Sequence, residues 1–203
     1  MSADPITEPV NEAQDPIDLL IEFEKASKEP IRAEYVEGMV IVPPQPDHNH
    51  NRAAYKLCVQ LTMAGLEHAG IGNGYRTGVT AEKTLSLLVP DFYVMRREPT
   101  DLDEAYRRTN RGWYPIELLH LAGEVTSTNH ETDTGPKYRS YAAAGVPLYV
   151  IVHRYERKVY VHSEPVPDKE QPTKSHYRTT TVTELGGKFL LPAPYPALDT
   201  SLL

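Results

Sequence analysis

The stretch from Gly123 to Val146, GEVTSTNHETDTGPKYRSYAAAGV, places the strongest constraint on the fold of this 203-residue chain. It begins at the end of an apolar strand candidate that carries a carboxylate, Glu124. It continues through polar residues into a helix candidate with Pro136 at its start and Gly145 at its end, the positions each residue type favours. The apolar run LYVIVH follows at once. A strand, a helix and a strand in succession predict a domain in which helices pack on a sheet.

Helix and strand signals alternate along the rest of the chain. Asp15-Pro16 is typical of a helix N-cap and first turn, AEYVEGMVIVPP of a hairpin, and a second helix is expected over Asn51–His68. Further strand candidates are GYRTGVT, TLSLLVPDFYVM, LYVIVH, KVYVHS, YRTTTV and KFLLP, and WYPIELLHLAGEVT contains an apolar strand that leads into Glu124. The polar stretch RREPTDLDEAYRRTNRG is expected to be an exposed loop or a short helix. This order predicts an α+β (α/β-like) fold: a mixed central β-sheet flanked by helices, with an additional N-terminal hairpin.

Chain length and composition indicate one domain. We expect residues 1–14, which are polar and contain proline, to form a flexible N-terminal tail, and residues 15–203 to form a single domain. No apolar run is long enough for a membrane span, and the first residues lack a signal-peptide pattern, so a soluble cytoplasmic protein is expected. The single cysteine, Cys58, excludes an intrachain disulfide framework and a cysteine-based zinc site.

Charge and motifs narrow the class of function. The formal net charge of −7 argues against binding nucleic acid by bulk charge, but it leaves room for an enzyme with a local basic groove. The sequence contains no GxxxxGK[ST], GxGxxG, HExxH or GxSxG motif. Phosphate-loop nucleotide binding and serine hydrolysis therefore have no support.

Two carboxylates interrupt apolar strand candidates. Asp91 follows Pro90 inside one, and Glu124 ends another. A carboxylate in such a position costs free energy unless it is paired or binds a cation. If the two strands are neighbours, both acids could reach one Mg²⁺ ion, with the backbone carbonyl of Val125 as a further ligand. Structural roles, a turn cap for Asp91 and a salt bridge for Glu124, remain the alternative.

The strand motifs VPDFYV and GEVTS resemble those of the PD-(D/E)xK nuclease superfamily. Together with EYVEGMVIVPPQPDHNH and the stretch from Gly123 onward, the series from Ile31 to Leu191 is similar to the Uma-type family of restriction-endonuclease-like proteins. The resemblance implies a restriction-endonuclease-like core with a divalent metal site at one edge of the sheet. With the two carboxylates it leads us to expect Mg²⁺, with Mn²⁺ as a possible substitute. DNA is the expected substrate, with RNA as the open alternative.

One position departs from the superfamily pattern. The E-x-K motif requires lysine two residues after Glu124, and this chain has Thr126, which cannot carry a positive charge. The next lysine is Lys137, on the following helix, where the Uma-type pattern also carries one. Lys137 and Tyr141 lie four residues apart and so share one helix face. We therefore expect Lys137 to supply the missing charge, with an exposed surface lysine as the alternative.

The resemblance implies roles for further residues. Glu34 occupies the acidic position of the early hairpin, where it would complete the acidic cluster or be a solvated strand acid. His48 would contact a phosphate or the substrate, or cap the following helix, and capping or loop packing is the favoured interpretation. Ser127, Asp133 and Tyr141 are expected to support the site rather than to react. His50 has no strong position in the family pattern.

Two functions follow from these expectations. The first is a Mg²⁺-dependent phosphodiester hydrolase, a DNA endonuclease, with Asp91 and Glu124 on the metal, Lys137 near the attacking water and Glu34 completing the cluster. The second is a catalytically inactive nuclease-fold protein that acts as a binding or regulatory partner. A homodimer suits two cuts in a duplex.

Overall fold

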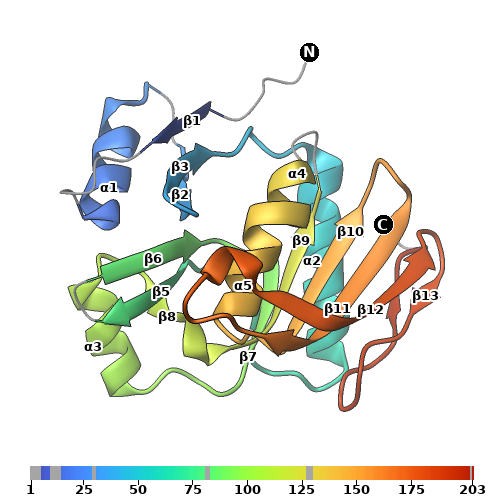
Figure 1. Ribbon diagram of the computed structural model, residues 1–203. Coiled ribbons are helices and arrows are strands. Elements are labelled where there is room, and N and C mark those ends of the chain that lie inside the picture. Colours follow the sequence, from blue (N-terminus) through green and yellow to red (C-terminus); the bar gives the residue numbers. More distant parts are fainter. Residues whose placement is uncertain (1–5, 10–14, 29–30, 81–82, 127–129, 202) are drawn as a thin grey trace. The chain divides into compact units, whose positions relative to one another are not determined.

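The computed structural model describes residues 6–9, 15–28, 31–80, 83–126, 130–201 and 203 (Figure 1). The chain forms two compact units, each assembled from three segments. The first unit consists of Met1–Gln45, Asn73–Val89 and Pro99–Ile116. The second consists of Pro46–Gly72, Pro90–Glu98 and Glu117–Leu203.

The first unit is a sheet with two helices. Its strands are β1 (Ile6–Pro9), β2 (Glu34–Val36), β3 (Met39–Val42), β5 (Tyr75–Thr80), β6 (Lys83–Leu88) and β8 (Tyr114–Pro115), and its helices are α1 (Pro16–Ala26) and α3 (Asp101–Thr109). The strand order is β1-β3-β2-β6-β5-β8, antiparallel except for the β5–β8 pair. Its buried core joins α1 to the sheet through Ile17, Leu20, Ala33, Val40 and Leu87.

Local signals in this unit predict its elements well. The Asp15 side chain accepts a hydrogen bond from the Ile17 N–H at 2.8 Å, so it caps α1 as expected. The β2–β3 hairpin turns at Glu37 and Gly38, whose φ angles are 50° and 85°. A two-residue turn with both residues at positive φ suits the right-handed twist of the strands. The stretch Asp101–Thr109, expected to be a loop or a short helix, is a helix with a Thr100–Asp103 capping box.

The second unit is a mixed sheet with helices against it. Its strands are β4 (Ala69–Gly70), β7 (Phe92–Met95), β9 (Leu119–Val125), β10 (Leu148–His153), β11 (Lys158–Val166) and β12 (His176–Glu184), in the order β12-β11-β10-β9-β7-β4. Strands β9 and β10 are parallel and the other pairs are antiparallel. The mixed sheet flanked by helices confirms the predicted fold class.

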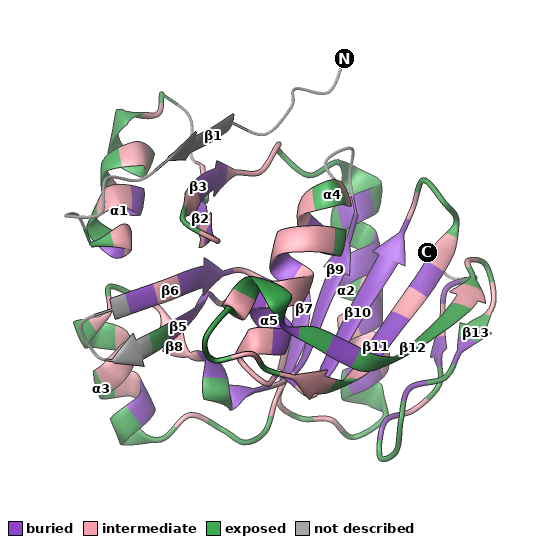
Figure 2. Ribbon diagram, in the orientation of Figure 1, coloured by how far each residue is buried: buried purple, intermediate pink, exposed green. Residues whose placement is uncertain are grey.

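The helical segments of this unit complete its layers. They are α2 (His48–Met63), α4 (His130–Thr132), the π-helix η2 (Asp133–Lys137), α5 (Tyr138–Ala143) and the short 3-10 turns η1 (Ile116–Leu118), which runs across the boundary between the units, and η3 (Pro172–Lys174). A two-stranded sheet of β13 (Lys188–Phe189) and β14 (Leu198–Asp199) follows. Apolar side chains of α2 pack on β7, β9 and β10 in one buried cluster. All six residues of β10 are buried, as Figure 2 shows.

Three expected elements differ from the structure. The segment TLSLLVPDFYVM, expected to be one interrupted strand, forms β6 and β7, which belong to different sheets. Pro90 explains the break, because proline donates no hydrogen bond and restricts the residue before it. The helix expected from Pro136 begins already at His130 and includes Pro136 in its π-helical turn. The second helix, expected over Asn51–His68, runs from His48 to Met63.

The N-terminal residues and the helices bear on two further predictions. Ile6–Pro9, inside the predicted tail, pairs antiparallel with β3, whereas residues 1–5 and 10–14 lie outside the described residues. Within the described ranges, no helix has the length and apolar character needed to cross a membrane.

Candidate functional site

Glu124 is a buried carboxylate near the C-terminal end of β9. It is only 2% exposed, so its charge requires partners inside the protein. Lys137 is 5% exposed, and its ammonium lies 3.0 Å from Glu124 Oε1. The Tyr141 hydroxyl donates to the same oxygen at 3.2 Å. The lysine predicted to serve Glu124 from the following helix therefore does reach its carboxylate.

Asp133 flanks the same ammonium from the π-helical turn. Its Oδ1 lies 3.8 Å from Lys137 Nζ, and its side chain is largely buried. Its backbone carbonyl accepts a hydrogen bond from the Tyr149 hydroxyl at 2.8 Å, which ties the turn to β10. Asp133 and Tyr141 therefore both lie around the Lys137–Glu124 pair, and their supporting role stays a prediction.

Asp91 lies immediately before β7, the strand that pairs with β9. Phe92 is opposite Gly123 in that pairing, so Asp91 and Glu124 are on neighbouring strands, one residue beyond this pair. The Val125 N–H donates to Asp91 Oδ2 at 2.8 Å. Gly123 is required here, because a Cβ atom at this position would lie 2.1 Å from the Phe92 ring.

His50 is the partner of Asp91 that the sequence did not single out. Its Nε2 lies 3.1 Å from Asp91 Oδ2, and its Nδ1 is buried without a hydrogen-bond partner among the described residues. Burial lowers the pKa of His50, but the hydrogen bond and the negative charge of Asp91 outweigh it and raise the pKa above its ordinary value. His50 lies four, seven and eleven residues before Ala54, Leu57 and Leu61, a spacing that places it on the apolar side of α2. This position on a buried helix face was the sequence signal that could have identified His50.

His48 does not have its predicted capping role. It is the exposed first residue of α2, and the N-cap is Asp47, whose Oδ1 accepts from the His50 N–H at 2.8 Å. Asp47 also pairs with Arg154 at 3.0 Å. The capping role expected for His48 was wrong: Asp47 caps α2, because an aspartate side chain accepts the hydrogen bond that a helix N-terminus offers.

Thr126 holds the strand end together at the position where the superfamily carries lysine. It is buried, its N–H donates to the Val152 carbonyl at 3.0 Å, and its hydroxyl accepts from the Arg154 N–H at 3.1 Å. Thr126 thus links the ends of β9 and β10. Ser127, expected to support the site, lies outside the described residues.

Glu34 belongs to the first unit. It is buried, and its Oε1 accepts from the Val89 N–H at 2.6 Å, so the alternative of a solvated strand acid was wrong. Its membership of the acidic cluster stays a prediction, since Asp91 and Glu124 belong to the second unit.

The donor chemistry suits a hard divalent cation. No group of three or more His, Cys, Asp or Glu side chains among the described residues is arranged to hold a metal ion. In general, Mg²⁺ keeps several waters and takes one or two protein carboxylates. Asp91 and Glu124, on neighbouring strands, provide two such carboxylates.

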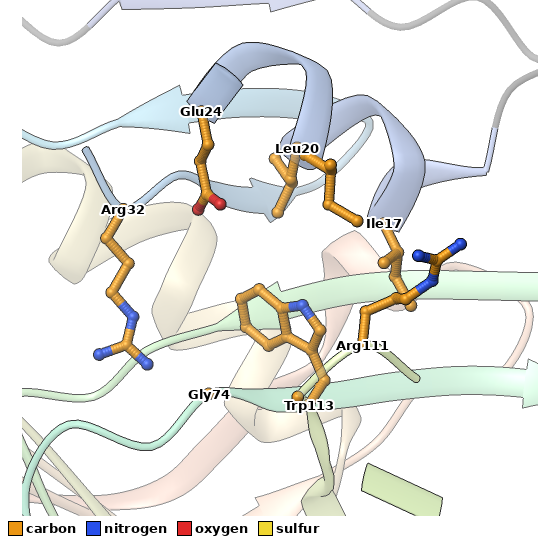
Figure 3. A pocket seen from close by; sticks show the side chains of 9 residues that line it. Ile17, Leu20, Glu24, Arg32, Gly74, Arg111 and Trp113 are labelled. Carbon is orange, nitrogen blue, oxygen red and sulfur yellow. The ribbon is translucent and has the colours of Figure 1, made fainter. Parts of the chain in front are cut away.

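A separate hollow lies within the first unit. It has a volume of about 180 Å³ and lies between α1 and the residues around Trp113 (Figure 3). Ile17 and Leu20 line it on the helix side, and Arg32 and Arg111 lie at its sides. None of the candidate site residues lines this hollow, so it is distinct from the acids of β7 and β9.

Comparisons with known proteins identify the family to which the chain belongs and a solved structure with a similar fold. The chain shares its fold with a solved structure: it is similar to the crystal structure of a putative nuclease belonging to DUF820 from Anabaena variabilis ATCC 29413, with a TM-score of 0.53 and 18% identity, over 86% of this chain and 88% of that one. The family model Uma2, described as putative restriction endonuclease, matches residues 17–200. The chain belongs to the Uma2 family. No curated protein matches it.

Proposed function

We propose that this protein is a divalent-metal-dependent phosphodiester hydrolase that acts on DNA. The observation that carries the proposal is the buried ammonium of Lys137, 3.0 Å from Glu124 Oε1 at the end of β9. In the E-x-K motif the lysine would place a cation beside the strand-end acid. This chain has Thr126 at that lysine position, so Lys137 would supply the cation instead. Membership of a family described as putative restriction endonuclease supports the substrate class.

Each residue has a distinct part in this proposal. Asp91 and Glu124 would hold Mg²⁺ or Mn²⁺, with the Val125 carbonyl as a further oxygen. The bound ion would polarise a phosphoryl oxygen and lower the pKa of a water. The Lys137 ammonium would orient the attacking water and stabilise negative charge on the phosphoryl group, because a preorganised cation in a buried site acts strongly there. Glu34 is proposed to complete the acidic cluster.

The supporting residues keep these groups in place. The Tyr141 hydroxyl and the Asp133 carboxylate hold the Lys137–Glu124 pair, and His50 holds the Asp91 carboxylate on the β7 side. His48, exposed at the start of α2, remains a candidate for a phosphate contact. Ser127 is proposed to bond a metal-bound water. A homodimer and a cytoplasmic location remain predictions from the sequence.

One observation favours the second candidate, a catalytically inactive partner protein. Glu124 Oε1 is engaged by both Lys137 and Tyr141, as in a structural ion pair. If that is its whole role, the fold would present a binding surface without hydrolysis.

A plasmid-nicking assay separates the two functions. We expect the wild type to nick supercoiled DNA with Mg²⁺ or Mn²⁺, and Asp91→Asn, Glu124→Gln and Lys137→Met to lose roughly 100-fold or more in rate. The matched controls are Glu131→Gln and Lys188→Met, which change exposed residues of the second unit. Circular dichroism should verify that each variant is folded at the assay temperature.

Metal binding gives a readout that does not depend on turnover. Titration of Mn²⁺ followed by electron paramagnetic resonance should show binding to the wild type and weaker binding to Asp91→Asn. Activity that survives both Asp91→Asn and Lys137→Met would contradict the residue assignments. A folded wild type that neither binds Mn²⁺ nor nicks DNA would favour the inactive partner.

A further inference from the structure

Strand β12 forms one edge of the sheet in the second unit. It pairs with β11 on one side, and no described strand pairs with its other side (Figure 1). It is nine residues long, and its register with β11 shows no shift. A long and regular edge exposes a row of backbone donors and acceptors that can pair with another strand.

The sequence of β12 lacks the features that usually protect an edge. Its centre, TTTVT over Thr179–Thr183, has no charge and no proline, and β-branched residues favour strand pairing. Most of this segment is exposed, and Val182 is 52% exposed. One charged residue stands on each side of the neutral centre, Arg178 before it and Glu184 after it. Neither forms an ion pair within the described part of the chain.

The pairing with β11 indicates which backbone groups face outward. The Leu185 N–H donates to the Arg157 carbonyl at 2.8 Å, directly after the Lys158–Glu184 pair. Because hydrogen-bonded and non-hydrogen-bonded pairs alternate in an antiparallel ladder, the odd-numbered residues of Thr179–Leu185 bond to β11. The N–H and C=O groups of Thr180, Val182 and Glu184 therefore point away from the sheet. The unchanged register at the Pro165–Tyr177 pair places those of Arg178 in the same alternation.

We propose that β12 pairs antiparallel with β12 of a second copy of this chain, about a two-fold axis at Thr181. In that register Thr180 lies opposite Val182 of the second copy, and both offer outward-facing groups. Arg178 lies opposite Glu184 of the second copy, and symmetry repeats the pair. If the register between the two copies shifted by one residue, outward-facing backbone groups of one strand would lie opposite inward-facing groups of the other. If it shifted by two residues, Arg178 would no longer lie opposite Glu184.

The self-complementary sequence of β12 indicates that its partner is a second copy of the chain. A two-fold interface uses the same surface on both copies, so each side must carry both members of every pair. The segment Arg178–Glu184 satisfies this condition, since its two charges are opposite in sign and equally distant from Thr181. Opposite charges directly across an antiparallel pair stabilise it, and like charges destabilise it. The proposal does not depend on hydrolytic activity.

Charge reversal tests the register. We expect sedimentation equilibrium to show a wild-type dimer, and Arg178→Glu alone or Glu184→Arg alone to weaken dimerisation roughly tenfold or more. An equimolar mixture of the two variants should recover the dimer, because each facing pair then joins Glu to Arg. Arg157→Glu, which makes the same change of charge on the exposed β10–β11 turn, is the control and should leave the dimer unchanged.

A backbone variant supplies the second measurement. Val182→Pro removes an outward-facing N–H and leaves the inward-facing donors of β12 in place, so it should yield a folded monomer by circular dichroism and sedimentation. A wild type that stays monomeric at millimolar concentration would overturn the proposal. So would a dimer that both single reversals leave intact, or a mixture that fails to recover it.

Discussion

At the scale of single residues, the buried charge of Lys137 dominates the energetics of the candidate site. Its ammonium lies between Glu124 at 3.0 Å and Asp133 at 3.8 Å. Removing charges from water is costly, and their attraction offsets that cost only when the geometry is good. Removing one partner of such a pair therefore destabilises the protein more than replacing both partners does.

The first prediction follows from this asymmetry. Lys137→Met should lower the free energy of unfolding by roughly 3 kcal/mol at neutral pH, because it removes the ammonium that lies 3.0 Å from the buried Glu124 carboxylate. Adding Glu124→Gln should recover part of that loss, with a coupling of about 1–3 kcal/mol. Urea denaturation of the wild type, both single variants and the double variant measures the cycle. Strict additivity would mean that the pair does not interact energetically.

At the scale of elements, α2 connects helix capping to the candidate site. Asp47 caps the helix, and His50, in the same turn, contacts Asp91. The hydrogen bond from the His50 N–H lowers the pKa of Asp47, and Arg154 lowers it further. Loss of the cap is therefore expected to disturb the His50–Asp91 contact, because Asp47 and His50 both belong to the first turn of α2.

The second prediction tests this connection. Asp47→Ala should lower the free energy of unfolding by about 1 kcal/mol through loss of the cap. Arg154→Gln is the companion variant, since it removes the exposed ion pair but keeps the cap, and it should cost less than about 0.5 kcal/mol. Thermal or urea unfolding followed by circular dichroism measures both. Equal losses in the two variants would assign the effect to the ion pair instead.

The third prediction concerns the β11–β12 pair and acid stability. Burial lowers the pKa of His162 to about 4, from an ordinary value of 6.5. The unfolded chain therefore binds this proton more readily, so the stability contributed by neutral His162 is present above pH 6.5 and is lost as the pH falls toward 4. The loss amounts to about 2–3 kcal/mol.

Replacing the ring tests the origin of this slope. His162→Phe keeps an aromatic side chain among Tyr138, Tyr149 and Tyr177 but cannot be protonated. Urea midpoints measured between pH 7 and pH 4.5 should fall less steeply for this variant than for the wild type. His176→Phe, at an exposed position, should retain the wild-type slope. An unchanged slope in His162→Phe would show that other groups control acid stability.

At the scale of the whole molecule, two sheets with separate cores share one chain. The first unit has a core around Ile17, Leu20 and Leu87, and the second has a core between α2 and its sheet. Compact units with their own cores are able to unfold separately. The single tryptophan, Trp113, lies in the first unit and so reports on that unit alone.

The fourth prediction uses Trp113 as a local probe. Lys137→Met, in the second unit, should lower the urea midpoint followed by far-UV circular dichroism and leave the midpoint followed by tryptophan fluorescence nearly unchanged. Non-coincident transitions are the sign that unfolding is not two-state. Coincident transitions in both the wild type and the variant would mean that the chain unfolds as one cooperative domain, as its length predicts.

The sequence by itself determined the features that depend on neighbours along the chain. Asp15 and Pro16 specify the start of α1, and Glu37-Gly38 the hairpin turn, because each conformation is favoured by the residues that adopt it. The acids at the ends of apolar strands and the absence of lysine at position 126 also follow from the residues alone. The family pattern also predicts a lysine on the following helix, at Lys137.

Only the tertiary structure decided which distant groups meet. Lys137 contacts Glu124 from a π-helical turn that no local pattern predicted. His50 contacts Asp91, which lies 41 residues further along the chain. The separation of β6 and β7 into two sheets is of the same kind. Such contacts depend on how strands and helices pack, because a buried charge takes whichever partner the packing brings within hydrogen-bonding distance.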